Sequence, residues 1–307
     1  MKKSILIIGS GGFFGNSILD YFSKKKKFSK KIDTIILINR SKKNFINHEL
    51  KKNFNIIQIK KDIAIAKTLP YADYVIYCVI SKNYSSDHKA VKNYVRLAKM
   101  YHLGSRVIYT SSGAVYGKQI KSTKIKNETQ KLNVKNFLTE NKKEYALLKL
   151  KNERLFKELS SFNIQVSIAR CFAFVGRYLP LKSNYVIGNF IQSILTGKNI
   201  SIKSNKKVFR SFMQSDDLVE ALLQLCVKKN SNFNIYNIGS DNVVDIHLLG
   251  KDLAKKYKLN LIAPRIMNED EYDMYIPNIN KFRKFFKFKK KLNSKKAITK
   301  TIKELKK

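Results

Sequence analysis

The residues of this sequence that could do chemistry fall into two short motifs, and the first is rich in glycine. The segment Gly9–Gly15 reads Gly-Ser-Gly-Gly-Phe-Phe-Gly and directly follows the apolar run Ile5–Ile8. Because Gly9, Gly12 and Gly15 have no side chains, backbone N–H groups and a helix N-terminus could approach a pyrophosphate there. The motif therefore predicts a dinucleotide-binding turn between a strand and a helix, and an ordinary turn is the alternative.

The second motif places a phenol and an ammonium one helical turn apart. Tyr145 and Lys149 stand at positions i and i+4, which lie on one face of an α-helix. A cation at this spacing can stabilise a phenolate, so the tyrosine can exchange a proton near neutral pH. A Tyr-x-x-x-Lys match is common by chance, but together with the glycine motif it predicts a proton donor beside a hydride carrier.

With both motifs, nearly the whole chain resembles the extended short-chain dehydrogenase/reductase family. Within this family it resembles the NAD-dependent epimerase/dehydratase type, which modifies nucleotide-activated sugars. Between the motifs, the segment Tyr109–Gly117 is similar to the family's catalytic-serine segment. In the family, the position matching Ser112 hydrogen-bonds the reacting sugar oxygen. The resemblance therefore implies that Ser112, Tyr145 and Lys149 form a catalytic triad.

The same resemblance assigns further positions. The segment Arg210–Leu218 is similar to a substrate-domain segment whose arginine contacts the diphosphate of a nucleotide-diphosphate sugar, which makes Arg210 the expected substrate contact. Cys171 would approach the nicotinamide amide through its backbone, with a buried structural cysteine as the alternative. Asp62 and Ile63 resemble the family's adenine contact, and a turn aspartate is the alternative there.

Two more features concern the dinucleotide. Phe13 and Phe14 are expected to pack their rings, while their backbone, that of Phe14 above all, lies beside the pyrophosphate. The second predicted strand ends in Asn39-Arg40-Ser41, where a carboxylate would bind a ribose 2′-hydroxyl and an arginine would accommodate a 2′-phosphate. No acid is present, so the pair Asn39 and Arg40 favours NADP over NAD as the cofactor, with NAD as the alternative.

The elements that must position these residues follow from the hydrophobic pattern. The first half alternates short apolar runs with helical stretches, which predicts βαβ units and a parallel sheet. Six strands are expected, at Ile5–Ile8, Thr34–Ile38, Asn55–Ile59, Tyr74–Ile80, Arg106–Thr110 and Gln165–Ala169. A helix from about Glu144 to Leu159 would carry Tyr145 and Lys149 and pack an apolar stripe on the sheet.

The expected fold class is α/β, a Rossmann doubly wound parallel sheet with a smaller mixed α/β substrate-binding lobe. Residues 1–170 would form the dinucleotide-binding domain, with the sheet rejoined by about residues 208–238. Residues 171–207 and 239–307 would form the lobe. The other expected elements are a helix at Gly188–Leu195 and a strand at Phe233–Ile238.

The composition and charge indicate which kinds of partner can be expected. The 307 residues include 62 Lys and Arg against 22 Asp and Glu, a formal net charge of +40, which ordinarily indicates a nucleic acid or an anionic membrane as partner. Here lysine is spread along the whole chain with abundant Asn and Ile, so we expect solvated faces and no nucleic acid partner. The run Ile5–Ile8 is too short for a signal peptide or a membrane span, so no membrane insertion is expected.

Cysteine and histidine spacing gives the remaining expectations. Cys78, Cys171 and Cys226 have no paired spacing for zinc or a disulfide framework, which fits a reducing cytoplasm. The four histidines have no metal-ligand spacing, so no metal is expected. The family resemblance adds a homodimer, formed through a helix pair of the cofactor domain.

The residues after the predicted catalytic serine narrow the reaction. Dehydratases of the family carry an Asp-Glu pair there, whereas Gly113 and Ala114 follow Ser112 and cannot do acid–base work. Dehydration is therefore not expected. The leading hypothesis is an NAD(P)-dependent oxidoreductase that reduces a keto group of a nucleotide-activated deoxysugar for surface polysaccharide synthesis. The alternatives are a nucleotide-sugar epimerase with tightly bound NAD, and a non-catalytic dinucleotide-sensing or polyanion-binding protein.

Overall fold

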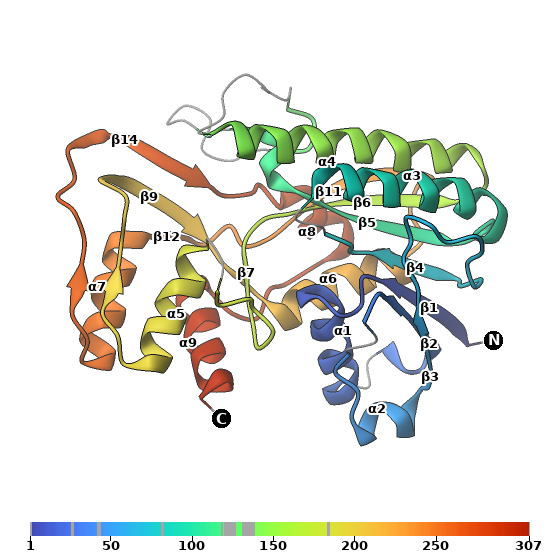
Figure 1. The fold of residues 1–307 in the computed structure, drawn as a ribbon, viewed down its shortest axis with the longest axis horizontal. Coiled ribbons are helices and arrows are strands. Elements are labelled where there is room, and N and C mark those ends of the chain that lie inside the picture. The colour runs from blue at the N-terminus through green and yellow to red at the C-terminus, as the bar shows by residue number, and fades with distance from the viewer. Residues whose placement is uncertain are drawn as a thin grey trace. The chain divides into compact units, whose positions relative to one another are not determined.

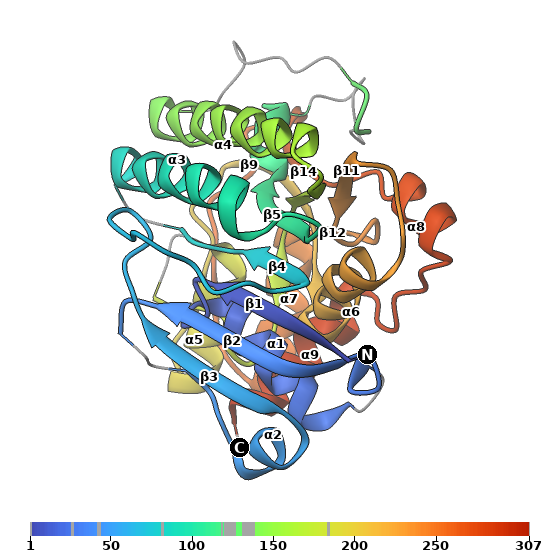
Figure 2. The same ribbon diagram turned by 90° about the vertical axis from the view of Figure 1, so that its right-hand side faces the viewer.

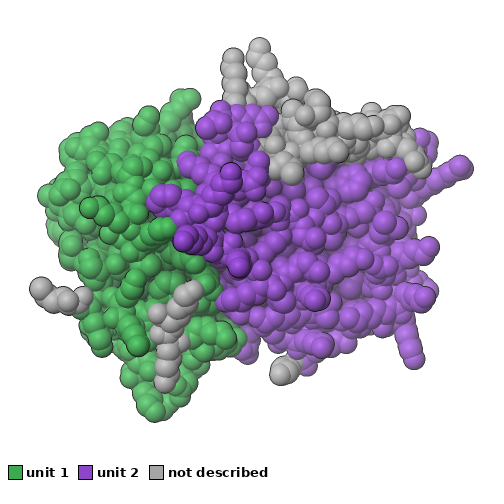
Figure 3. Space-filling view, turned by 180° about the vertical axis from the view of Figure 1, so that it is seen from behind, with its two compact units in different colours: residues 1–115, 137–171, 219–236 green, residues 116–136, 172–218, 237–307 purple. Residues whose placement is uncertain are grey.

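The computed structural model describes residues 2–25, 28–41, 44–80, 83–117, 119, 127–130, 139–182 and 185–306, with residues 268–272 described by their backbone alone. The chain divides into two compact units (Figure 3). The first unit comprises residues 1–115, 137–171 and 219–236, and the second comprises residues 116–136, 172–218 and 237–307. Each unit is discontinuous in sequence, because the chain crosses between them several times.

A seven-stranded sheet forms the centre of the first unit, in the order β11-β6-β5-β4-β1-β2-β3. Its strands are β1 (Lys3–Ile8), β2 (Ile32–Asn39), β3 (Asn55–Lys60), β4 (Tyr74–Tyr77), β5 (Arg106–Ser112), β6 (Gln165–Cys171) and β11 (Phe233–Ile238). The strands β1 to β6 pair in parallel, and β1 lies between β2 and β4. The sheet is therefore wound in both directions from β1, which confirms the predicted doubly wound α/β fold class.

Helices cover this sheet on both faces. Figures 1 and 2 show α3 (Tyr84–Tyr101) and α4 (Glu140–Glu158) side by side over one face and α1 (Phe13–Lys24) on the other. The remaining helical segments that touch this unit are α2 (His48–Asn53) and α6 (Ser215–Val227). Because both faces are covered, strands such as β4 are buried at every residue and read as continuous apolar runs.

An aromatic cluster packs α3 and α4 onto the sheet. Tyr77 of β4, Tyr109 of β5, Tyr94 of α3 and Phe156 of α4 are all fully buried. The ring centroids of Tyr109 and Phe156 lie 4.3 Å apart, and those of Tyr77 and Tyr94 lie 4.9 Å apart. Large buried rings of this kind contribute much of the hydrophobic stabilisation of a core. The cluster therefore fixes α4 against β5, the strand that ends at the predicted catalytic serine.

The strand boundaries differ from the predicted ones at the carboxyl edge of the sheet. Strand β4 ends three residues before the predicted Ile80. Strands β5 and β6 instead run two residues further than predicted, through the register pairs Ser111–Arg170 and Ser112–Cys171. The pairing continues there because Ser111 and Arg170 are buried and form hydrogen bonds within the unit.

The second unit is a mixed α/β structure built on short strands. Strand β9 (Lys206–Ser211) pairs antiparallel with β12 (Val243–Asp245) and parallel with β14 (Asn268–Tyr275). Two smaller pairs are β7 (Phe174–Val175) with β10 (Met213–Gln214), and β8 (Ile200–Ser201) with β13 (Leu261–Ile262). Its helices are α5 (Val186–Thr196), α7 (Ile246–Tyr257), α8 (Asn280–Phe286) and α9 (Ser294–Leu305). The unit matches the predicted mixed lobe in class.

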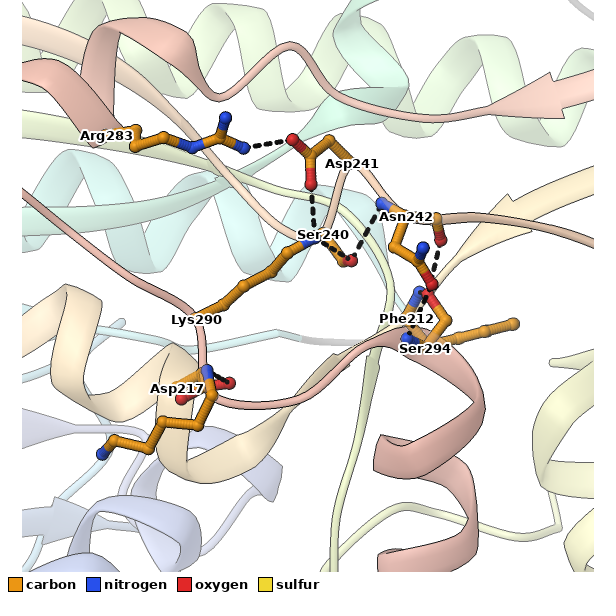
Figure 4. Close-up of polar contacts among 9 residues, drawn as sticks. Phe212, Asp217, Ser240, Asp241, Asn242, Arg283, Lys290 and Ser294 are labelled. Carbon is orange, nitrogen blue, oxygen red and sulfur yellow. Dashed lines mark hydrogen bonds and ion pairs between the residues drawn. The ribbon is translucent and has the colours of Figure 1, made fainter.

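A polar network fastens the C-terminal segment within the second unit (Figure 4). Asp241 pairs with both Arg283 and Lys290. The backbone N–H of Ser294 donates to Asn242 Oδ1 at 3.0 Å, and the Ser294 hydroxyl donates to the Asn242 carbonyl at 2.5 Å. Because Ser294 is the first residue of α9, this network sets where the last helix begins.

Candidate active site

The residues singled out in the sequence of the first unit gather at one edge of its sheet. They share a position at or just after the carboxyl end of a strand: Gly9 (β1), Asn39 and Arg40 (β2), Asp62 and Ile63 (β3), Ser112 (β5), and Cys171 (β6). The carboxyl ends of parallel strands meet at a common edge, and doubly wound sheets bind ligands there. The topology therefore brings these positions together.

Two of the three predicted glycines are required by the backbone itself. Gly9 has a φ of +90°, and a Cβ there would lie 2.9 Å from backbone atoms of Cys78 and Val79. A Cβ on Gly15 would lie 2.2 Å from the carbonyl oxygen of Ser10. A side chain at either position would force strand β1, the turn or α1 to shift.

Gly12 has no such packing role. It is the N-cap residue of α1, and no side chain caps the helix there. A Cβ at Gly12 would meet only the carbonyl oxygen of Gly9, at an ordinary 3.5 Å. The first N–H groups of a helix need an external partner, so the open N-terminus fits the pyrophosphate of a dinucleotide. Phe13 and Phe14 open the helix with their rings packed edge to face, 5.7 Å between centroids.

At the end of β2, an amide stands where a carboxylate would mark an NAD site. Asn39 Nδ2 donates to Ser10 Oγ at 3.0 Å and to Asn44 Oδ1 at 2.9 Å, while the Ser41 N–H donates to Asn39 Oδ1 at 3.0 Å. Asn39 thus ties the glycine turn to the end of β2. The Arg40 side chain is exposed and has no acidic partner in the described part of the chain.

Asp62 and Ile63 form the turn after β3. Asp62 Oδ1 accepts a hydrogen bond from the Ala64 N–H at 2.9 Å, and the Ile63 side chain is buried. This arrangement is compatible with both the adenine contact and the turn aspartate, because it uses one of the two carboxylate oxygens of Asp62.

Ser112 and Cys171 are neighbours across β5 and β6. They are register partners, both are buried, and Ser112 Oγ accepts from the Ala114 N–H at 3.1 Å. Burial raises the pKa of the Cys171 thiol, although the nearby Lys149 ammonium lowers it, so Cys171 stays a neutral thiol at physiological pH. Gly113, which follows Ser112, opens a short 3₁₀ helix.

Tyr145 and Lys149 both lie on α4. This helix begins at Glu140, four residues before the predicted start, because the Thr139 hydroxyl caps it by accepting from the Lys142 N–H at 3.3 Å. Lys149 is buried at 2 % exposure, with its ammonium 5.8 Å from the centre of the Tyr145 ring.

The charge state of Lys149 follows from its surroundings. Burial on its own lowers the pKa of a lysine, but Tyr109, Tyr145 and Asp87 together raise the pKa of Lys149 above its usual value. Burial raises the pKa of the Tyr109 phenol to about 12, although Lys149 acts against this. Lys149 is therefore a cation at neutral pH, with its ammonium 5.1 Å from the ring centre of a neutral Tyr109 and 5.8 Å from that of Tyr145.

Three buried polar residues near Lys149 were missed among the sequence candidates. They are Asp87 on α3, and Asn152 and Glu153 on α4. Asn152 Oδ1 lies 2.8 Å from Nδ1 of His88, which joins α4 to α3. Positions 152 and 153 follow Lys149 by three and four residues, so helical spacing was the signal that could have found them.

The predicted substrate contact Arg210 lies in β9 of the second unit. Its Nη1 donates to the carbonyl oxygens of Phe209 and Asp273 at 2.9 and 2.8 Å, and its Nη2 donates to Asp273 Oδ2 at 2.7 Å. Nε and the second hydrogen of Nη2 form the other edge of the guanidinium and have no partner among the described residues. That edge can still bind a phosphate with two hydrogen bonds.

In the ranges described above, no group of three or more His, Cys, Asp or Glu residues could hold a metal ion. No described helix is long and apolar enough to cross a membrane. Cys78, Cys171 and Cys226 are free and buried.

Comparison with known proteins gives relatives along most of the chain. Residues 5–239 match the model of the NAD dependent epimerase/dehydratase family. UDP-glucuronic acid decarboxylase 2 of Arabidopsis thaliana is 23% identical over 98% of this chain and 67% of its own length. dTDP-D-glucose 4,6-dehydratase of Dictyostelium discoideum is 28% identical over 83% of this chain and 61% of its own length. The chain thus spans about two thirds of the length of these relatives.

Solved structures share the fold at low identity. UDP-N-acetylglucosamine 4-epimerase from Methanobrevibacter ruminantium M1, in complex with UDP-N-acetylmuramic acid, superposes with a TM-score of 0.77 at 20% identity, over 99% of this chain and 98% of that one. DesIV, a dTDP-glucose 4,6-dehydratase from Streptomyces venezuelae with NAD and TYD bound, gives 0.78 at 16% identity, over 98% and 96%. The family model covers well over half of the sequence, and the chain belongs to the NAD-dependent epimerase/dehydratase family.

Proposed function

We propose that the protein is an NAD(P)-dependent oxidoreductase that reduces a keto group of a nucleotide-activated deoxysugar in the cytoplasm, for surface polysaccharide synthesis. The observation that carries this proposal is the buried, charged Lys149 between Tyr145 and the strand that ends at Ser112. The next two residues, Gly113 and Ala114, have no acid–base group. The site therefore offers a proton donor for carbonyl reduction and no carboxylate at the position that dehydration uses.

Each residue of the triad has one task in this reaction. A bound nicotinamide dinucleotide would supply the hydride to the carbonyl carbon. Tyr145 would donate its phenolic proton to the carbonyl oxygen, and the Ser112 hydroxyl would hydrogen-bond that oxygen. The Lys149 ammonium would stabilise the phenolate that remains. Arg210 would bind the diphosphate through the guanidinium edge that Asp273 leaves open.

NADP is the cofactor we favour. A 2′-phosphate carries negative charge, and no carboxylate at the end of β2 would repel it, since Asn39 occupies that place. The exposed guanidinium of Arg40 is suited to pair with it. NAD remains the alternative, supported by the NAD-bound DesIV structure of the same fold.

A nucleotide-sugar epimerase with tightly bound NAD is the second candidate. The same triad serves it, because the hydride is removed and returned to the sugar within one turnover. The epimerase of Methanobrevibacter ruminantium, which has the same fold, supports this candidate. The third candidate, a dinucleotide-sensing or polyanion-binding protein without turnover, is supported by the net charge of +40 and opposed by the complete triad.

The state of the cofactor separates the first two candidates. We would denature the purified protein and identify the released dinucleotide and its molar ratio by mass spectrometry. Near-stoichiometric NAD favours the epimerase, because a hydride that is lent and returned requires a cofactor that stays bound. An empty protein, or one that exchanges NADP(H) freely, favours the reductase, which is then assayed by NADPH consumption with keto-sugar nucleotides.

The triad is tested by Tyr145→Phe. We expect this variant to lose turnover by a factor of about 100 to 10,000, because the proton donor is gone, while dinucleotide affinity stays unchanged. Tyr84→Phe is the matched control, since the Tyr84 ring lies 6.1 Å from that of Tyr145 but its hydroxyl bonds Asn141. Turnover at the wild-type rate in Tyr145→Phe would refute the assignment.

We also propose that two copies of the chain associate through α4. The outward face of this helix bears an exposed stripe at spacings of four and three residues: Glu140, Glu144, Leu147, Lys151 and Arg154. Antiparallel packing of two copies centred on Leu147, which is 41% exposed, would place Glu140 opposite the partner's Arg154 and Glu144 opposite the partner's Lys151. The acidic half of the stripe thus complements the basic half of a second copy.

A charge swap tests this dimer. Lys151→Glu with Arg154→Glu should dissociate it, because like charges would face each other, and adding Glu140→Lys with Glu144→Lys should restore it. Sedimentation velocity measures the assembly. Lys255→Glu with Lys256→Glu, on an exposed part of α7, is the control for the change of net charge. A monomeric wild-type chain would refute the proposal.

A further inference from the structure

We propose that a buried network of Glu153, Arg170 and Ser111 is a positioning device that holds the catalytic helix α4 in place relative to Ser112. The inference rests on the proposed function for the reaction it serves. It goes beyond the triad, because the three network residues are buried and hydrogen-bond to one another.

The network is an ion pair completed by a hydroxyl, all inside the first unit. Glu153 of α4 is 6% exposed and Arg170 of β6 is 3% exposed. Arg170 Nε donates to Glu153 Oε1 at 3.1 Å, and Arg170 Nη2 donates to Glu153 Oε2 at 2.8 Å. The Ser111 hydroxyl of β5 donates to Glu153 Oε1 at 2.5 Å. One carboxylate thus binds two neighbouring strands to the helix.

The network lies next to the triad along every element it joins. Ser111 and Arg170 are register partners, and the following register pair contains Ser112. On α4, Glu153 follows Lys149 by one helical turn. Any shift of the helix along or around its axis would therefore change these hydrogen bonds and the distance from Lys149 to Ser112 together.

Stability alone does not account for this network. A well-packed apolar group of similar volume is often as stabilising as a buried ion pair. The helix is already held by apolar contacts, such as Phe156 stacked on Tyr109 at 4.3 Å. Apolar contacts tolerate small sliding movements, whereas a two-bond guanidinium–carboxylate pair fixes direction as well as distance. Because a misplacement of about 1 Å can cost about 100-fold in rate, the network supplies what the apolar core lacks.

The first test compares two buried serines at opposite ends of β5. Ser111→Ala removes the 2.5 Å hydrogen bond to Glu153, and Ser105→Ala removes a 2.6 Å hydrogen bond to the Ala72 carbonyl, just before the strand begins. Both side chains are almost fully buried, so the loss of stability should be similar. We expect kcat to fall about tenfold or more in Ser111→Ala and less than twofold in Ser105→Ala, with KM for the dinucleotide unchanged in both. Equal kcat values would overturn the inference.

The second test removes both charges at once. The double variant Glu153→Leu/Arg170→Met leaves no unpaired buried charge, so it should fold with a melting temperature close to that of the wild type. We expect its kcat to fall about 100-fold while dinucleotide affinity is kept. A double variant with wild-type kcat would overturn the inference.

A structural measurement keeps this inference separate from the proposed function. Crystal structures of the wild type and the double variant, each with NADP, give the distance from the Tyr145 hydroxyl to Ser112 Oγ without any sugar. We expect this distance to change by about 1 Å in the variant. If the wild type turns over no nucleotide sugar, the proposed function fails and this distance decides the inference. An unchanged distance overturns the inference even if the wild type is active.

Discussion

Asp87 in the first unit is buried and Asp241 in the second is partly buried, and their pKa values are shifted in opposite directions. Burial raises the pKa of Asp87, and the charges of Lys149 and His88 offset this only in part. Asp87 Oδ1 is buried and has no hydrogen-bond partner among the described residues. Burial without a direct donor therefore disfavours the ionised form of Asp87, close to the Lys149 ammonium.

Asp241 has the partners that Asp87 lacks. Burial acts to raise its pKa as well, but hydrogen bonds and ion pairs with Lys290 and Arg283 lower the pKa below its usual value. Deep burial and the lack of a direct donor act together on Asp87, whereas direct donors outweigh partial burial at Asp241. In the second unit, the ion pairs of Asp241 hold the C-terminal segment in place (Figure 4).

The largest effect is expected where a buried pair of the first unit is broken. Arg170→Met leaves the Glu153 carboxylate buried without its partner, so the free energy of unfolding should fall by about 3–5 kcal/mol. Arg283→Met, the same change at the partly exposed Asp241 pair, should cost about 1 kcal/mol or less. Urea unfolding at pH 7 measures both. Equal losses of unfolding free energy in the two variants would show that the burial of an ion pair does not determine its contribution to stability in this protein.

The next effect is a gain of stability at neutral pH in Asp87→Asn. Because the pKa of Asp87 is raised in the folded state, the free energy of unfolding falls as the pH rises from the unfolded-state value of about 3.9 through the raised value, and the loss disappears in acid. Asn cannot ionise, so the free energy of unfolding at pH 7 should rise by about 1.4 kcal/mol for each unit of the raised pKa. Urea unfolding between pH 4 and pH 7 should show a flatter profile for the variant.

Asp73, a carboxylate of the same unit, is the control for the sign of this change in stability. Asp73 accepts hydrogen bonds from the N–H of Ser4 and from Lys3, and its pKa is lowered although burial acts against this. Asp73→Asn should therefore reduce stability at pH 7. A loss of stability in Asp87→Asn as well would contradict the distinction between carboxylates with and without direct donors.

What the sequence could predict was local. The glycine motif, the apolar runs of the strands and the spacing of Tyr145 and Lys149 are patterns within a few residues of each other, and they predicted the fold class. Propensity and periodicity carry information of that range. The alternation of strands and helices added the sheet, because such connections leave few topologies.

What the sequence could not predict depends on contacts between distant segments. Only the pairing of β5 with β6 under α4 gives Ser111 and Arg170 the common partner Glu153. Asp87 stands in the first turn of α3, where a carboxylate is normally solvated and favourable, and the tertiary packing of the unit buries it. The pairing of Arg210 with Asp273 likewise needs β9 beside β14.

The smallest effect is expected at Asp241. Its lowered pKa means that its ionised form stabilises the fold above the unfolded-state value of about 3.9, and this contribution is lost as the pH falls through the folded-state value. Asp241→Asn should therefore cost up to about 1 kcal/mol at pH 7, less in high salt, and nothing in strong acid. Asp252→Asn is the matched control, because the Asp252–Lys295 pair is more than half exposed and should contribute nothing measurable. Urea unfolding at several pH values would contradict the assignment if the two variants behaved alike.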